Sequence, residues 1–395
     1  STRLHIADLS HNLHDCGWVN ECGGGWNGFR TRGDHYQRVF DLLAATLPVL
    51  DTYSLRGRHG PGAVSDGKGR STKYDFPIWP IKLETVFPFD WFGSSKLSFE
   101  ELVPPDGIAF SKLIAVPKSA KGPRLIACEP ICNQWIQQAL MSWFIDAFDK
   151  SLARGSININ DQSISQLYAK RASDGSLATI DLKSASDRLS CFLVERVFRR
   201  RADILSHLMA CRTPLLRQDL DKTCPTWIEL KKFATQGSAL TFPVQSFVFF
   251  CVSIAAVLYE KRLNPTIENI KSVQKDVVVY GDDIIIPVSA FGELVNALHS
   301  LGLKVNTQKS FGSGYFRESC GSDWYKGEDV TPNYIRQDFD RNAPTTVASL
   351  LEVSNNFHKS GLWSLARYVA SRVPIGMLKN IAVENGSVAI KGLFS

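Results

Sequence analysis

The sequence lacks several features that would place it in a special class of protein. Its longest nearly unbroken apolar run, residues 247–259, falls short of the about 20 residues that cross a bilayer, and its first residues lack the basic-then-apolar order of a signal peptide. It contains no C-x-x-C pair, and its nine cysteines are scattered and odd in number. Membrane association, secretion and a disulfide framework are therefore not predicted, whereas reduced thiols in a cytoplasm fit this pattern.

What is present is an ordinary globular composition. Hydrophobic residues make up 44% of the 395 residues and charged residues 21%, which excludes an intrinsically disordered chain. At about 150 residues per domain, the length predicts two or three packed units. The net charge of +6 permits a polyanionic partner without requiring one.

The chain contains clear signals for helices and strands. Residues 177–181 form a short apolar run that ends in Asp181, which predicts a buried strand with the carboxylate at its tip. Residues 242–258 predict a buried helix with Thr241 as its N-cap. Earlier in the chain, residues 36–47 predict an amphipathic helix that the following proline ends.

A hairpin is predicted after the buried helix. Residues 277–280 and 284–287 are strand-like, and only Gly281, Asp282 and Asp283 separate them. A carboxylate-bearing bend between two buried strands is the natural interpretation.

A further helix and strand complete the pattern. Ser289 is predicted to cap an amphipathic helix that Gly302 stops, and residues 303–306 are predicted to return as a strand. The order of strand, helix, hairpin, helix and strand resembles a split βαβ sheet with helices on one face, so the predicted fold class is α+β.

The carboxylates on these strands predict a chemistry. Asp181 ends one predicted strand, and Asp282 and Asp283 occupy the bend between two others. Because adjacent strands lie about 4.8 Å apart, the three carboxylates can converge. Clustered carboxylates repel one another unless cations lie between them, and hard oxygen ligands suit Mg²⁺ or Mn²⁺. Two such ions about 3.5–4 Å apart would activate an attacking oxygen and stabilise a leaving one, as in nucleotidyl transfer.

A metal-free turn is the alternative, because Gly-Asp-Asp alone is a good turn sequence. The apolar strands on both sides of the bend, and a partner aspartate at the end of a separate strand, favour the metal site.

Several motifs resemble those of known polymerases. The segments Tyr280 to Asp283 and Asp181 to Asp187 look like the two carboxylate motifs of viral RNA-directed RNA polymerases. More narrowly, one set of segments resembles the replicase catalytic subunit of the positive-strand RNA bacteriophages, the leviviruses: residues 116–124, 160–162, 178–190, 316–321 and 329–332. The resemblance runs from about Ser111 to Arg336 in the family's order, which is far more specific than any single motif.

The resemblance implies roles for the acidic residues. Asp181 and Asp282 would be the principal metal ligands, with Asp283 assisting, and two Mg²⁺ ions would be the cofactor, for which Mn²⁺ can substitute. Asp187 would lie near the incoming ribose, where a carboxylate accepts from a 2′-hydroxyl and favours ribonucleotides. The alternative for Asp187 is a carboxylate that satisfies backbone amides at the start of a helix.

A glycine loop before the buried helix also matches the polymerases. Gly237, Thr241 and Gln245 keep the spacing of a motif that checks the ribose and supports the template, but glutamines replace the family's serine and asparagine. Ser238 is the nearest hydroxyl, so the residue that contacts the nucleotide stays open. A plain helix N-terminus is the alternative.

The segment 111–124 carries basic residues and no acid. Its alternation with apolar residues predicts an ordered strand whose basic side chains point one way, and the resemblance places such a strand in the fingers of the polymerase. Lys118, Lys121 and Arg124 would bind the triphosphate and the leaving pyrophosphate. A solvated charged face is the alternative.

Other basic residues are weaker candidates. Lys309 matches a lysine that would donate a proton to the leaving pyrophosphate, although Lys304 lies close enough in the sequence to be confused with it. Arg56, Arg58 and Arg70 belong to a glycine-rich region and would either contact template phosphates or keep a loop solvated.

The family's right-handed architecture implies a division of the chain into parts. The predicted parts are fingers at 1–165, palm at 166–190, a fingers insertion at 191–232, palm at 233–338 and a short thumb at 339–395. Compared with the family, the chain is short at both ends, as expected of a compact member or a fragment.

The resulting expectation is an RNA-directed RNA polymerase that copies a viral RNA genome from NTPs in the cytoplasm of an infected bacterium. Primer-independent initiation and host translation proteins as further subunits follow from the resemblance only. A reverse transcriptase, which would incorporate dNTPs, and a non-enzymatic RNA-binding module, which would expose aromatics on its strands, are the rivals.

Overall fold

The computed structural model describes residues 31–66, 73–93, 109–119, 122–335, 338–343 and 345–378, and two short strands at 383–384 and 393–394. The chain divides into two compact units. The larger comprises Ser1–Val116 and Arg124–Val330, and the smaller comprises Pro117–Pro123 and Thr331–Ser395. The predicted division into fingers, palm and thumb does not follow these two units and stays a prediction.

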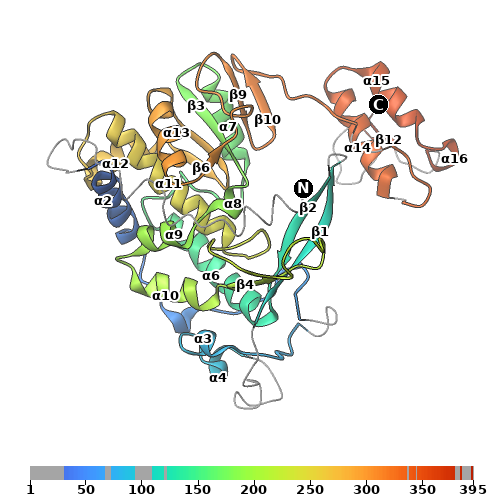
Figure 1. The fold of residues 1–395 in the computed structure, drawn as a ribbon. Coiled ribbons are helices and arrows are strands. Elements are labelled where there is room, and N and C mark those ends of the chain that lie inside the picture. Colours follow the sequence, from blue (N-terminus) through green and yellow to red (C-terminus); the bar gives the residue numbers. More distant parts are fainter. Residues whose placement is uncertain are drawn as a thin grey trace. The chain divides into compact units, whose positions relative to one another are not determined.

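The larger unit contains a four-stranded antiparallel sheet, which lies in the upper part of that unit in Figure 1. Its strands, in spatial order, are β6 (Val278–Tyr280), β7 (Asp283–Pro287), β3 (Leu177–Lys183) and β8 (Lys304–Val305). The predicted hairpin is confirmed as β6 and β7, and the returning strand as β8. β3 continues past Asp181 to Lys183 and pairs there with β8, so the prediction that Asp181 lies at the strand tip is wrong.

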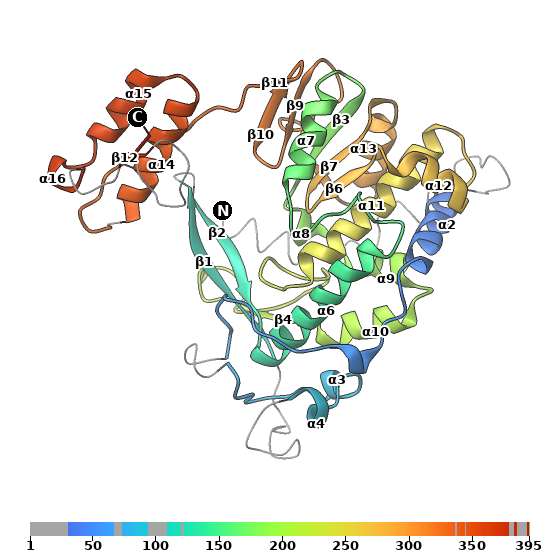
Figure 2. The same ribbon diagram turned by 180° about the vertical axis from the view of Figure 1, so that it is seen from behind.

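Helices cover both faces of this sheet, not one face as predicted. Ile284 and Ile286 of β7 belong to the main core together with α11 (Thr241–Glu260) and α13 (Phe291–Ser300). Ile285 points the other way and packs with α7 (Ser163–Ala172). Because β7 is apolar on both faces, each face needs a cover. Figures 1 and 2 show α7 and α11 on either side of the strands.

Helix ends differ from the predictions in three places. Thr241 is the first residue of α11 and donates its hydroxyl to the carbonyl of Thr235, so it is not the N-cap. Ser289 lies in a 3₁₀ turn before α13 and does not cap that helix. The first helix, α2 (Arg32–Ala45), begins earlier than predicted because Thr31 and Asp34 form a capping box.

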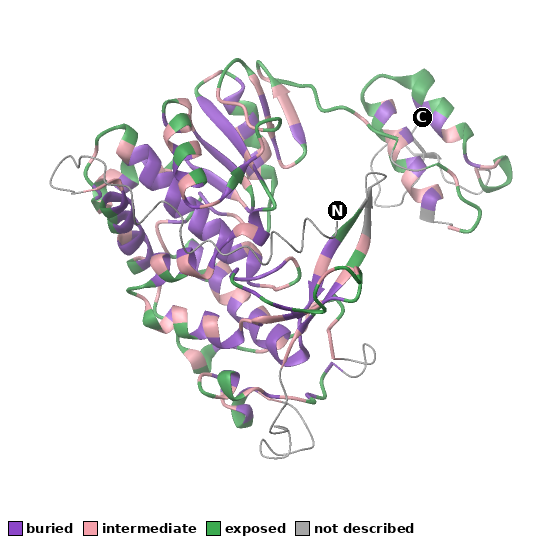
Figure 3. Ribbon diagram, viewed as in Figure 1, coloured by how far each residue is buried: buried purple, intermediate pink, exposed green. Residues whose placement is uncertain are grey.

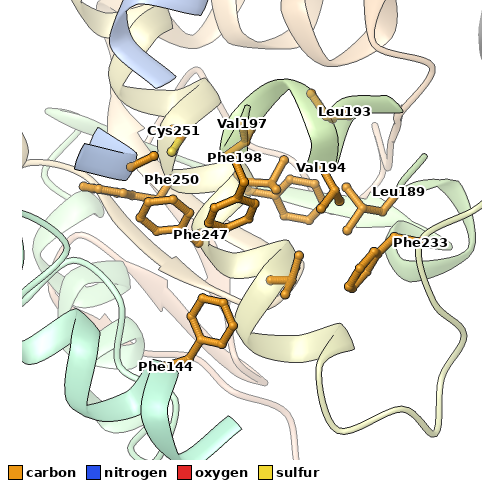
Figure 4. Close-up of a cluster of buried hydrophobic side chains, with 14 of the residues drawn as sticks. Phe144, Leu189, Leu193, Val194, Val197, Phe198, Phe233, Phe247, Phe250 and Cys251 are labelled. Carbon is orange, nitrogen blue, oxygen red and sulfur yellow. The ribbon is translucent and has the colours of Figure 1, made fainter. Parts of the chain in front are cut away.

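The helix α11 is the core of the larger unit. By length and composition it could cross a membrane, but 94% of its apolar stretch is buried inside the fold, as in the core helix of a globular protein (Figure 3). Phe247 stacks on Phe148 of α6 (Ile131–Asp149) with the ring centroids 5.7 Å apart. It also stacks on Phe198 of α9 (Cys191–Phe198), and Figure 4 shows the apolar side chains that converge there.

A second four-stranded sheet has the order β2-β1-β4-β5. It contains β1 (Ser111–Ser119), β2 (Gly122–Cys128), β4 (Leu215–Arg217) and β5 (Trp227–Glu229). The basic segment 111–124 is therefore divided between two neighbouring strands and is not one strand. A three-stranded antiparallel sheet consists of β9 (Phe316–Ser319), β10 (Ser322–Tyr325) and β11 (Glu328–Asp329).

Short helices complete the larger unit: η1 (Thr52–Ser54), α3 (Ile81–Glu84), α4 (Phe89–Phe92), α8 (Ala185–Arg188), α10 (Ala202–Cys211) and α12 (Ile267–Gln274). The smaller unit contains α14 (Thr345–Lys359), α15 (Trp363–Ser371), α16 (Ile375–Leu378) and the strand pair β12 (Val383–Glu384) and β13 (Leu393–Phe394). It has its own small core, in which Leu350 and Phe357 of α14 pack against Ala366 and Val369 of α15.

Candidate active site

The sheet brings two of the predicted carboxylates together. Asp181 on β3 lies directly opposite Asp283, the first residue of β7. Residues that face each other across two antiparallel strands project to the same side of the sheet and are close neighbours. Asp282 is exposed in the turn between β6 and β7.

The electrostatics of the site reflect this crowding. Burial raises the pKa of Asp283 to about 7, and the negative charge of Asp282 adds to the effect. Burial also raises the pKa of Asp181, and Asp282 again contributes, while a hydrogen bond from Asn306 opposes the shift. The three carboxylates therefore repel one another across the hairpin.

The donor set suits a hard divalent cation in its chemistry. All three groups offer carboxylate oxygen, and a cation between them would relieve their mutual repulsion, which adds to the effect of burial on the pKa values of Asp181 and Asp283. Within the described ranges, however, no group of three or more His, Cys, Asp or Glu side chains is arranged as a metal site. The metal role of these residues stays a prediction.

Asn306 and Cys320 bond to the carboxylates, and Ser310 bonds to the backbone of Asp181. Asn306 donates from Nδ2 to Oδ2 of Asp181 at 2.6 Å, and the backbone N–H of Asp181 donates to Oγ of Ser310 at 3.1 Å. Cys320 donates to Oδ2 of Asp283 from its backbone N–H at 3.1 Å and from its thiol at 3.3 Å. Sequence reasoning did not select Asn306 or Cys320, although Cys320 lies in the segment 316–321 that carries the family resemblance and Asn306 ends the predicted strand 303–306.

Cys320 has an unusual backbone. Its φ of 51° and that of Gly321, 71°, form a left-handed bend between β9 and β10. Burial and the charge of Asp283 raise the pKa of the Cys320 thiol to about 12. The thiol therefore stays protonated and able to donate to the carboxylate.

Lys309 is tied to the carboxylates electrostatically. Its Nζ donates to Oε1 of Glu318 at 2.5 Å, and this bond raises the pKa of Lys309, with smaller contributions from Asp181 and Asp283. Lys304 lies on β8, opposite Lys183.

The first turns of α11 pack against the bend of the hairpin. The backbone N–H of Gly281 donates to Oγ of Ser246 at 3.1 Å, and the ring of Phe242 meets that of Tyr280 edge-on. A Cβ added to Gly281 would lie 2.6 Å from the Phe242 ring and 3.3 Å from Nε2 of Gln245, at a φ of +64°. Only glycine fits this bend without strain.

The glycine loop before α11 packs against β2. A Cβ at Gly237 would lie 1.9 Å from the carbonyl oxygen of Ala127, and its φ is +134°. The N–H of Ala127 donates to the carbonyl of Gln236 at 2.7 Å. Ser238 accepts from the N–H of Leu240 at 3.3 Å, so its hydroxyl, like that of Thr241, already bonds within the loop and helix start.

The other predicted site residues are more scattered. Arg124 is exposed on β2, and Asp187 is buried in the short helix α8. Arg56 and Arg58 are exposed, and the guanidinium of Arg56 donates to carbonyls of its own loop. Lys118 lies on β1 with its side chain outside the described part, and Lys121 and Arg70 lie outside the described residues altogether.

Fold and site together define a mixed α+β protein whose antiparallel sheet carries Asp181 and Asp283 on neighbouring strands. A family model for the RNA replicase beta-chain matches residues 98–363, and this range includes all three carboxylates. The chain belongs to this family.

Curated relatives agree with this assignment. The chain is 36% identical to the RNA-directed RNA polymerase subunit beta of Escherichia virus Qbeta, over 64% of this chain and 40% of the relative. It is 34% identical to the RNA-directed RNA polymerase beta chain of Enterobacteria phage GA, over 83% of this chain and 52% of the relative. The chain thus spans about half the length of these relatives or less.

A solved structure is also similar. It is an insertion-loop deletion mutant of the RNA-dependent RNA polymerase of a human picorbirnavirus, with a TM-score of 0.45 and 12% identity. The match covers 69% of this chain and 60% of that one.

Proposed function

We propose that this chain is the catalytic part of an RNA-directed RNA polymerase that copies a phage RNA genome from NTPs in the cytoplasm of an infected bacterium. The observation that carries the proposal is the pairing of Asp181 with Asp283 across β3 and β7, inside the segment that matches the replicase family. Primer-independent initiation, host proteins as further subunits and the division into fingers, palm and thumb belong to the same proposal.

The carboxylates are the proposed centre of the reaction. Asp181 and Asp282 would hold two Mg²⁺ or Mn²⁺ ions, with Asp283 assisting. When bound, such ions lower the pKa of an attacking 3′-hydroxyl and stabilise charge on a leaving pyrophosphate. Asn306 and Cys320 would orient the two carboxylates, because Asn306 donates a hydrogen bond to Asp181 and Cys320 donates one to Asp283.

Lys309 is the proposed general acid. Its ammonium would give a proton from Nζ to the pyrophosphate as that group leaves. The bond to Glu318 keeps this ammonium protonated, and the charges of Asp181 and Asp283 add to that effect.

The remaining predicted residues would bind the substrates. Lys118, Lys121 and Arg124 would hold the triphosphate, and Asp187 would accept from the ribose 2′-hydroxyl. Gly237, Ser238 and Thr241 would shape the nucleotide site, while Gln245, whose buried Oε1 lacks a hydrogen-bond partner among the described residues, would support the template. Arg56, Arg58 and Arg70 would contact template phosphates.

The direct test is Asp282→Asn in the full chain. We expect incorporation of labelled NTPs on an RNA template to fall by about 100-fold or more, since the change removes a charge that would hold the metal ions. RNA binding, measured by filter retention, should stay close to that of the wild type. Asp219→Asn, which alters an exposed carboxylate paired with Arg217, is the matched control and should keep its activity.

Two results would contradict the proposal. One is incorporation by the Asp282→Asn variant at the wild-type rate. The other is a wild-type protein that incorporates dNTPs well in excess of NTPs, because that preference belongs to a reverse transcriptase. Chelation with EDTA should abolish incorporation, and added Mg²⁺ or Mn²⁺ should restore it.

A further inference from the structure

A pocket of about 850 Å³ lies in the larger unit, outside the proposed active site. It opens between the C-terminal end of α7 and the segments that flank the β9–β10 hairpin. The residues that matter for its chemistry are Tyr168, Lys170, Arg171, Asp174, Tyr315 and Lys326.

The pocket lies at the opposite end of the sheet from the carboxylates. Asp174 precedes β3, whose first residue, Leu177, is four positions before Asp181, or about 13 Å along the strand. The β9–β10 hairpin also extends from the carboxylates to the pocket. Cys320 in its bend contacts Asp283, while Tyr315 and Lys326 flank its open end. Figures 1 and 2 both show α7 beside this hairpin.

Aromatic rings and cations alternate at the pocket and beside it: Tyr315 lines the pocket, whereas Tyr325 and Trp324 lie outside its lining and contact lysines that line it. Nζ of Lys326 lies 4.9 Å from the ring centroid of Tyr315 and 5.6 Å from that of Tyr325. Nζ of Lys170 lies 5.1 Å from the ring of Trp324. Tyr315 and Tyr325 are each 45% exposed, so their rings are accessible to a ligand.

The charge of the pocket is positive. Lys170, Arg171 and Lys326 face one carboxylate, Asp174, which accepts from the backbone N–H of Ser176 at 2.7 Å. Arg171 is paired with Asp276 at 3.1 Å. Lys170 and Lys326 have no acidic partner among the described residues, so both ammonium groups can bind an anion.

We propose that this pocket binds a short stretch of single-stranded RNA, separate from the RNA held at the carboxylates. Bases would stack on Tyr315 and Tyr325, and Lys170 and Lys326 would bind the phosphates. Exposed aromatic rings with cations between them form the general surface for single strands, because every base has a stacking face and every nucleotide a charge. An apolar protein segment would leave the two lysines without partners.

The lysine that covers Tyr315 does not prevent this binding. A cation over an exposed ring is held weakly, and stacking of a base on the same ring is the stronger interaction. Lys326 can therefore move from the ring to a neighbouring phosphate when RNA binds, and it keeps a favourable contact in both states.

The first test measures binding of a fluorescein-labelled 10-nucleotide oligouridine to the full chain by anisotropy, without NTPs and in EDTA. We expect Tyr315→Ala to weaken binding by about 10-fold, and Lys326→Gln to weaken it about 3-fold with a salt dependence smaller by about one phosphate contact. Tyr315→Phe keeps the ring and should bind like the wild type. Lys271→Gln, an exposed lysine on α12, is the control for general loss of charge.

The second test needs no variant and so does not depend on correct folding of one. An oligouridine that carries 5-iodouridine is photo-crosslinked to the wild-type chain, and the modified peptides are mapped. A crosslink at Tyr315 or Tyr325 is expected. Crosslinks confined to other peptides, or equal affinity in the wild type and a Tyr315→Ala, Lys326→Gln double variant, would overturn the proposal.

The outcome is independent of the proposed polymerase activity. A chain that incorporates no NTPs but crosslinks at Tyr315 loses the proposed function and keeps the RNA site. A chain that extends a short primer but shows no pocket crosslink keeps the function and loses the site.

Discussion

Gly281 lies in the bend that carries Asp282 and Asp283, so its replacement acts directly on the candidate site. We expect Gly281→Ala to destabilise the fold by about 2–3 kcal/mol, because the new Cβ adds a clash with Phe242 to the strain of a left-handed backbone. Urea unfolding gives the loss in free energy.

Gly155→Ala is the matched control for this change. Gly155 also has a positive φ, +77°, but nothing lies within 4 Å of the added Cβ. The variant should therefore lose only about 1 kcal/mol in the free energy of unfolding, which is the cost of the strained backbone. Equal losses in the two variants would show that the contact with Phe242 is unimportant.

His35 makes the stability depend on pH. It lies on α2 with its ring edge-on to that of Tyr259, and burial lowers its pKa from 6.5 to about 4. Between these two values the unfolded chain takes up a proton that the native chain refuses, so the free energy of unfolding falls as the pH falls from about 6.5 to about 4. Above 6.5 the contribution of His35 is complete.

The measurement is urea unfolding at pH 7, 6 and 5, with His35→Gln for comparison. The variant should have a shallower slope, by at most about 1.4 kcal/mol per pH unit. His59 and His207 also have pKa values lowered by burial, so part of the slope should remain. A slope unchanged by the substitution would contradict the assignment.

The sequence predicted which carboxylates form the candidate site, but it did not predict the residues that donate hydrogen bonds to them. The apolar runs beside Asp181 and Asp283 predicted neighbouring strands, and the short distance between neighbouring strands is why the two carboxylates were expected to converge. Asn306 and Cys320 were not selected, because a hydrogen bond to a carboxylate depends on a loop conformation that has no periodic signal.

Among the elements, α11 and the hairpin are joined by a hydrogen bond to Ser246, whose hydroxyl also donates to the carbonyl of Phe242 in its own helix. Ser246→Ala leaves the N–H of Gly281 without its acceptor, and we expect a loss of about 1–2 kcal/mol in stability together with reduced NTP incorporation. Thermal unfolding and the incorporation assay measure the two effects.

Ser253→Ala is the control on the same helix. Ser253 is fully buried, and its hydroxyl has no hydrogen-bond partner in the part of the chain that the structure describes. Its removal should cost little or be stabilising. A loss as large as that of Ser246→Ala would mean that burial, and not the bond to Gly281, accounts for the effect.

The elements themselves were predicted better than their ends. The strands around the hairpin and the helices 242–258 and 36–47 follow from long apolar patterns, and all are present. Thr241 and Ser289 failed as caps because each lies next to a turn that the pattern does not reveal. The cover of α7 on the second face was missed, since its only fully buried apolar residues are two alanines, Ala169 and Ala172.

For the molecule as a whole, the two units predict two unfolding transitions. Leu350→Ala opens a cavity in the small core of α14 and α15, and should lower only one transition, by about 2–4 kcal/mol. Leu298→Ala, the same change at a fully buried position in α13, should lower only the other. Scanning calorimetry separates the two, and a single transition shifted by both variants would contradict two independent units.

This division is the part of the fold that the sequence predicted least. The length suggested two or three units, but their limits depend on contacts between distant segments, such as residues 117–123 with the region after Thr331. No local pattern carries such information.

The close approach of Gly237 to the carbonyl oxygen of Ala127 has a consequence for how this protein can vary. A methyl group there would have to displace β2, and with it the exposed Arg124 three positions earlier. In a library with every amino acid at position 237, selection for folded protein alone should therefore retain glycine, whatever the loop contributes to catalysis.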